Sequence, residues 1–189
     1  VSLGFVINAL KKQVVVDVEN AMEVKVDNLT GKFYFNSFQA EVTSVPATKF
    51  YVRLAYRYLY VKTTYSGQLL ERPFISANRA FLSLDYTTLS DWKFDYTINY
   101  NGKKRIPGTQ ANPPQYQRDQ YSPQYVLMGT QITKTVGKKY PMDFYIGAEN
   151  LTNFFQKDVI VSADQPFSPY FDAALVWGPV SGRMFYAGW

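Results

Sequence analysis

Apolar and polar residues alternate with a period of two in segment after segment of this chain. In residues 92–100, WKFDYTINY, every apolar side chain falls on one face, and Lys93, Asp95, Thr97 and Asn99 fall on the other. Period two is the repeat of a β-strand, whose successive side chains point to opposite faces, whereas an amphipathic helix repeats every 3.6 residues. The pattern therefore predicts strands with one apolar and one polar face.

The same alternation returns often enough to predict an all-β fold of about eight strands. The segments are 3–9, 34–43, 50–62, 80–87, 92–100, 126–136, 143–149 and 183–189. Several of them extend to about 10–13 residues, whereas strands in soluble proteins are most often about 5–6 residues long. A strand that crosses a membrane needs about 9–11 residues, so the lengths favour membrane-spanning strands.

The expected connections alternate between short and long. The short ones are 45–49, 89–91 and 137–140, and the long ones are 18–31, 63–73, 103–123 and 151–180. Short turns on one rim and long loops on the other are typical of bacterial outer-membrane barrels, which have short periplasmic turns and long extracellular loops. We therefore expect an antiparallel, up-and-down segment of a transmembrane β-barrel.

Aromatic residues make up 17% of the chain, and many lie near the expected strand ends. The pairs are Tyr60 and Tyr65, Trp92 and Tyr100, Tyr121 and Tyr125, and Phe185 and Trp189. Their placement resembles the two interfacial girdles of a membrane barrel. The high β-propensity of aromatic residues is the alternative explanation, and we favour the girdles.

The absence of two residue types limits the catalytic and metal-binding chemistry that this chain can perform. The chain has no cysteine and no histidine. Thiolate nucleophiles, histidine general bases and the commonest metal ligands are therefore missing, and we expect no enzyme, no cofactor and no metal site. The net charge of +5 does not demand a nucleic-acid partner, and we expect none.

The 103–123 connection is the polar stretch best suited to ligand binding. It opens with Lys103-Lys104-Arg105 and later carries Tyr116, Arg118 and Tyr121, which could present stacking and charged groups to a ligand. We take these last three residues as candidate ligand contacts in an extracellular loop. The simpler reading is a surface loop stiffened by proline.

The C-terminal quarter resembles a known family. Residues 145–153, YIGAENLTN, look like a strand end that recurs late in TonB-dependent outer-membrane receptors. The stretches 163–172, 175–179 and 182–188 are similar to the segments that follow it. Upstream, residues 36–41, 53–58 and 104–107 resemble the same family, especially its Bacteroidota-type members.

The resemblance implies that residues 1–189 are the C-terminal portion of a larger barrel, with the plug domain and the earlier strands outside this sequence. It implies a place in the bacterial outer membrane, in contact with lipid. It also implies uptake of a scarce or large substrate (an iron chelate, cobalamin, a glycan or a peptide), energised by a TonB-type periplasmic protein. A surface lipoprotein stays open as a further partner. Residues Arg53, Arg57, Asp95 and Asn99 would face the lumen.

Two other readings remain open. The length allows a complete, small eight-stranded outer-membrane barrel with a structural or adhesive role, in which the first and last strands would pair. The alternation also fits a soluble, carbohydrate-binding β-sandwich. The face formed by every second residue of 92–100 would meet lipid in a barrel and would form the core of a sandwich.

Overall fold

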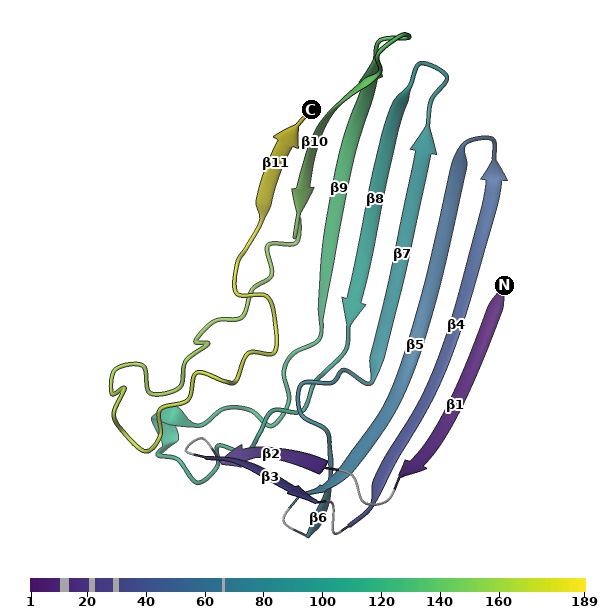
Figure 1. Ribbon diagram of the computed structural model, residues 1–189. Coiled ribbons are helices and arrows are strands. Elements are labelled where there is room, and N and C mark those ends of the chain that lie inside the picture. Colours follow the sequence, from purple (N-terminus) through teal and green to yellow (C-terminus); the bar gives the residue numbers. More distant parts are fainter. Residues whose placement is uncertain (11–13, 21–22, 29–30, 66) are drawn as a thin grey trace.

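A computed structural model describes residues 1–10, 14–20, 23–28, 31–65 and 67–189. Its main element is one antiparallel sheet that is long in the strand direction (Figure 1). Along the sheet the strands follow the order β1 (Ser2–Leu10), β4 (Phe33–Ala47), β5 (Phe50–Tyr65), β7 (Asn78–Thr87), β8 (Trp92–Asn101), β9 (Tyr125–Val136), β10 (Met142–Glu149) and β11 (Met184–Gly188). These strands confirm the eight segments expected from the alternation.

The remaining elements lie at the end of the sheet where the long connections gather. A short strand, β6 (Gln68–Glu71), pairs with β5, and a hairpin of β2 (Val14–Asn20) and β3 (Glu23–Asn28) forms a separate two-stranded sheet. A single 3₁₀ turn, η1 (Pro114–Tyr116), interrupts the connection from β8 to β9. In the described ranges there is no helix long and apolar enough to cross a membrane.

The connections are sorted by length as expected. The β4–β5, β7–β8 and β9–β10 turns lie together at the top of Figure 1, and the long connections lie together at the bottom. Lys49 and Asp91 adopt positive φ values of 63° and 61° in the first two turns. In the third, Gly137 has a φ of 93°, and a Cβ there would lie 2.6 Å from the carbonyl oxygen of Tyr140. Only glycine fits this turn without strain.

The strand register aligns the alternating faces of neighbouring strands. Directly paired residues point to the same side of an antiparallel sheet. Leu54 pairs with Leu82, which pairs with Ile98, which pairs with Met128. One face of the sheet, which we call the apolar face, is therefore continuous across the strands.

The apolar face is largely uncovered. Leu54 is 50% exposed and Ile146 is 61% exposed, although each lies on a strand that has a paired neighbour on both sides. The opposite side, which we call the polar face, carries Gln39, Arg53 and Asp95.

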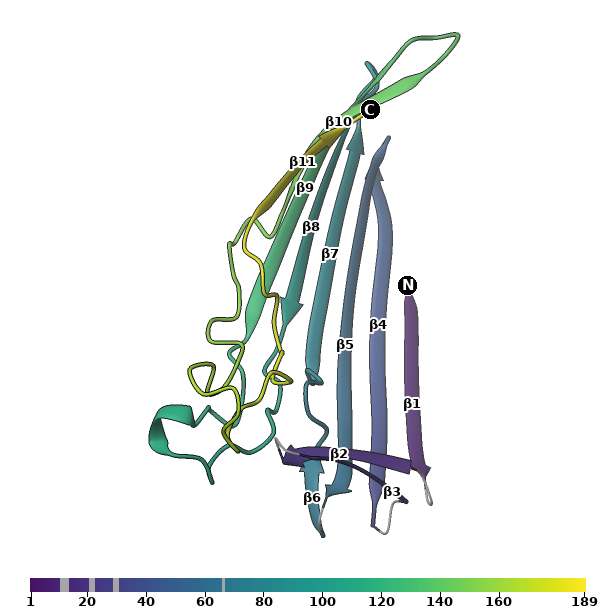
Figure 2. The ribbon, with the colours of Figure 1, turned by 60° about the vertical axis from the view of Figure 1, so that its left-hand side comes forward.

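Buried apolar residues concentrate at the long-connection end. Phe33 and Val61 are buried there on the side of the polar face, with Val15 of the β2–β3 hairpin packed against them. Both views show this hairpin lying across the strands rather than extending the sheet (Figures 1 and 2). The hairpin thus covers a buried apolar cluster on the polar face of the sheet.

The edges of the described sheet are open. Strand β1 pairs with β4 and strand β11 pairs with β10, and the described residues contain no pairing between β1 and β11. The all-β antiparallel fold is therefore confirmed, and the sheet does not close on itself.

Candidate functional site

The long connections pack together into one assembly, which we call the loop cluster. Its buried centre is formed by Ile106, Tyr116, Val161 and Leu175, with Phe74, Tyr170 and Trp177 against it. These residues come from three separate connections, those following β6, β8 and β10. The connections are therefore held in a defined arrangement by their own core, as binding loops commonly are.

An ion pair joins the loop cluster to the β2–β3 hairpin. The guanidinium of Arg105, only 4% exposed, donates to both carboxylate oxygens of Glu19 and to the backbone carbonyl of Glu71. It also lies 5.7 Å from the ring centre of Tyr65. Because an unpaired buried charge is costly, this contact fixes where the hairpin sits.

Lys104 is the second buried cation of the cluster. Its ammonium donates to the hydroxyl of Tyr125 at 3.0 Å and to the carbonyl oxygen of Trp177. The ring of Tyr125 stacks on Phe154, with centres 4.6 Å apart and planes 6° apart. Lys104 thus ties the start of the β8–β9 connection to the start of β9 and to the last long connection.

Gln156 organises that last connection from within. Its side-chain amide donates to the carbonyl of Leu175, and its amide oxygen accepts from the backbone N–H groups of Trp177 and Gly178 at 2.8 and 3.1 Å. The residue is 5% exposed. One buried side chain therefore satisfies three backbone groups that would otherwise lack partners.

The three candidate ligand contacts lie in two different places within the loop cluster. Tyr116 is 8% exposed and belongs to the cluster core, where its hydroxyl donates to Asp164 at 2.9 Å and its ring stacks on Tyr170. Arg118 and Tyr121 instead line a hollow of about 160 Å³. Its other lining residues include Asp119, Lys157, Asp158 and Trp177.

This hollow has the chemistry of a small polar ligand site. It offers cations, carboxylates and the indole of Trp177, so it suits a ligand with both charged groups and a flat or apolar part. Burial, followed by the nearby carboxylate of Glu71, raises the pKa of the Tyr121 hydroxyl above its ordinary value. A tyrosine hydroxyl is protonated at neutral pH even at its ordinary pKa, and the upward shift keeps Tyr121 a hydrogen-bond donor to still higher pH.

The four residues expected to face a lumen all lie on the polar face. Arg53 donates to both carboxylate oxygens of Glu41, at 2.9 and 3.1 Å. Asp95 lies directly opposite Asp85 on the neighbouring strand. Arg57 and Asn99 line a hollow of about 270 Å³ in this face.

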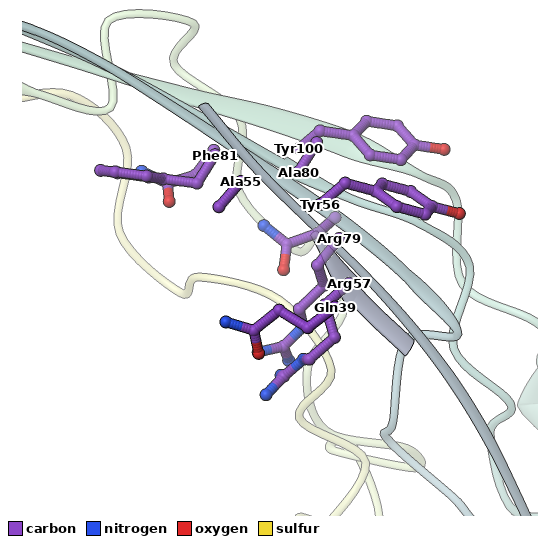
Figure 3. Close-up of a pocket in the computed structure, with 10 residues that line it drawn as sticks. Gln39, Ala55, Tyr56, Arg57, Arg79, Ala80, Phe81 and Tyr100 are labelled. Carbon is purple, nitrogen blue, oxygen red and sulfur yellow. The ribbon is translucent and has the colours of Figure 1, made fainter. Parts of the chain in front are cut away.

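Figure 3 shows this second hollow. Gln39, Arg57 and Arg79 extend to one side of the sheet, and Tyr56 and Tyr100 extend to the other. Arg79 stands directly opposite Arg57 in the β5–β7 register. Arg79 precedes the segment expected as a strand and was not among the predicted site residues, and neither were Glu19 and Gln156. Only the arginine carried a usable signal, because it continues the alternation of 80–87 by one residue.

Within the described part of the chain, no three carboxylate side chains come together in a way that could hold a metal ion. No protein-family model matches the chain, and no curated protein matches it at significant similarity. The family resemblance drawn from the motifs therefore stays a prediction.

Proposed function

We propose that this chain forms part of the wall and extracellular rim of an outer-membrane transport receptor of the TonB-dependent kind. The observation that carries the proposal is the exposed apolar face of the sheet, backed by a polar face on the same strands. A soluble protein buries such a face, whereas a membrane barrel turns it to lipid.

Aromatic and aliphatic residues form bands along the apolar face. Phe50, Tyr86 and Phe94 pair across three strands near the tight turns. Leu54, Leu82 and Ile98 pair in the middle, and Tyr58 and Tyr60 follow toward the long connections. This order matches an apolar belt between two aromatic girdles.

The dimensions of the band agree with a membrane. The stretch from Phe50 to Tyr60 spans roughly 33 Å at about 3.3 Å per residue. A strand tilt of about 40° reduces this to roughly 25 Å, which is the height of the apolar band of outer-membrane barrels. Tyr65 and Tyr125 do not belong to the girdle, because both are buried in the packing at the long-connection end.

The open edges favour a segment of a larger barrel over a small complete one. Unpaired backbone groups are not tolerated in hydrocarbon, so further strands must pair with β1 and β11 if the sheet spans a membrane. The small-barrel alternative requires β1 to pair with β11, and these strands lie at opposite ends of the described sheet. The sandwich alternative requires a second layer over the apolar face, and the described residues supply none.

The membrane placement is tested with two arginine substitutions at adjacent positions of β8. Ile98 belongs to the apolar face and Thr97 to the polar face. In the full-length protein, Ile98→Arg should cost about 2–4 kcal/mol at the bilayer midplane and reduce the amount of folded protein in the outer membrane. Thr97→Arg should reach the membrane at nearly the normal level. Equal behaviour of the two variants would contradict a lipid-facing apolar face.

The transport role has a separate test. Cells with and without the full-length gene are compared for accumulation of iron chelates, cobalamin, glycans and peptides, with and without an uncoupler. We expect one class to lose both its gene-dependent and its energy-dependent uptake. Unchanged uptake of all four classes would refute the role even if the membrane placement holds.

A further inference from the structure

Two arginines face each other on the polar face without a carboxylate between them. Arg57 of β5 and Arg79 of β7 are directly paired in the strand register. Both side chains are half-buried. The Nε atom of Arg79 is buried and has no hydrogen-bond partner among the described residues.

The other strand cations of this face are neutralised. Arg53 bonds Glu41 at 2.9 Å, and Lys93 lies 3.7 Å from Asp143. The described ion pairs include neither Arg57 nor Arg79. Like charges placed directly opposite each other in a sheet are destabilising, so this pair demands a counter-ion from elsewhere.

The surroundings of the two arginines offer room and neutral donors. The hollow of about 270 Å³ is lined by both arginines and by three residues with side-chain amides, Gln39, Asn99 and Asn101. Gln39 pairs with Arg57 and Asn101 pairs with Arg79, so one row of the sheet presents two amides around two cations. Figure 3 shows Gln39, Arg57 and Arg79 directed to the same side.

We propose that Arg57 and Arg79 form a binding site for an oxyanion, a carboxylate or a phosphate group, completed by the amides of Gln39, Asn99 and Asn101. The planar guanidinium presents parallel N–H donors that match the two oxygens of such a group. Bound between the two cations, the anion removes their repulsion. The absence of an acidic side chain from the hollow leaves the positive charge for the ligand.

The site goes beyond the proposed transport role, because it depends only on the register of the sheet and not on its placement in a membrane. The oxyanion can come from a free solute or from a carboxylate side chain of another part of the full-length protein. The two sources share one chemistry. A free solute leaves the site open to added anion, whereas an internal carboxylate already occupies it.

The test measures thermal unfolding of the full-length protein in detergent, followed by intrinsic fluorescence. Inorganic phosphate is titrated against chloride at equal ionic strength. The variants Arg57→Gln and Arg79→Gln each remove one cation, and Arg79→Lys keeps the charge but loses the forked geometry. Arg72→Gln is the matched control, because Arg72 is exposed and lies outside the hollow.

For a free oxyanion we expect phosphate to raise the unfolding midpoint of the unaltered protein in a saturable way, as a ligand of the native state does. Either glutamine variant should abolish the shift, Arg79→Lys should weaken it, and Arg72→Gln should retain it. For an internal carboxylate we expect no phosphate shift, together with a lower midpoint in both glutamine variants and an unchanged midpoint in Arg72→Gln.

Two results would overturn the proposal. One is an equal phosphate shift in all variants, which reports a general salt effect. The other is no phosphate shift combined with an equal or higher midpoint in Arg57→Gln and Arg79→Gln, because removal of one of two unpaired cations then only relieves repulsion.

Discussion

Loss of the buried ion pair between Glu19 and Arg105 should destabilise the β2–β3 hairpin locally. Glu19→Gln keeps the shape of the side chain and removes its charge. The guanidinium of Arg105, with a side chain only 4% exposed, then loses its charged partner and keeps the carbonyl of Glu71. The hairpin that carries Glu19 should open more often, because its main link to the loop cluster is weakened.

The magnitude follows from the burial of the two partners. Removal of one partner from a fully buried pair costs about 3–5 kcal/mol. The side chain of Glu19 is 24% exposed, and a glutamine still accepts one hydrogen bond from Arg105. We therefore expect about 2–3 kcal/mol, which makes local opening roughly 30- to 150-fold more frequent.

The assay is hydrogen exchange of the full-length protein, read by mass spectrometry on peptides from β2 and β3. Exchange there should quicken by the stated factor in Glu19→Gln. The double variant with Arg105→Met should recover part of the protection, since no uncompensated charge remains buried. Glu41→Gln is the matched control, because Glu41 is about as exposed as Glu19 while its partner Arg53 is 55% exposed. Exchange near Glu41 should change by less than about three-fold.

Exchange of the hairpin within about two-fold of the unaltered protein in Glu19→Gln would refute this reasoning. It would mean that apolar packing of Val15 against Phe33 and Val61 alone holds the hairpin.

Two further substitutions test the loop cluster, and each is measured as the rate of limited proteolysis within residues 150–183. Gln156→Ala leaves the carbonyl of Leu175 and two backbone N–H groups without partners. Because each unsatisfied group costs about 1–3 kcal/mol, this connection should be cleaved readily. Unchanged cleavage would show that water replaces the amide. Lys104→Met keeps roughly the length of the side chain but removes the donor to the hydroxyl of Tyr125 and the carbonyl of Trp177, so cleavage should rise by a smaller factor. A slower rate than in the unaltered protein would show that an apolar side chain packs better there.

Much of the sheet could be predicted because its signal is local. The alternation in 50–62 and 92–100 sets the two faces of each strand regardless of what the strand pairs with. The short turns could be predicted as well, since Gly137 and Asp91 are residue types that tolerate positive φ. The confirmed strands and the sorted connections follow from these two local features.

The expected long connections of 18–31 and 63–73 contain strands that the sequence analysis did not predict. Strand β3 lies within the first, where Val24 and Val26 alternate over too short a stretch to stand out. Strand β2 begins with three consecutive valines, which show no alternation at all. The hairpin forms because its residues pack across the sheet and because Arg105 holds Glu19, and neither contact is visible in the local pattern.

The candidate site residues also divide into those that local alternation could place and those that it could not. Residues Arg53, Arg57, Asp95 and Asn99 could be assigned to a polar face from alternation alone, and the structure places them there. Tyr116 could not be separated from Arg118 and Tyr121, because all three share one polar connection. Burial of Tyr116 depends on residues that lie about 45 to 60 positions later in the chain.

By itself, the sequence determined that the chain forms long strands with one apolar and one polar side, because the two-residue repeat is a property of each extended backbone segment. Only the tertiary structure decided which side chains meet across those strands. A shift of one residue in the register would move Arg79 to the other face. The pairing that sets Arg57 against Arg79 rests on the whole run of contacts between residues 50–58 of β5 and residues 78–86 of β7. The ion pair between Glu19 and Arg105 likewise depends on the path of the chain through the six strands that lie between them, β3 to β8, which no local pattern specifies.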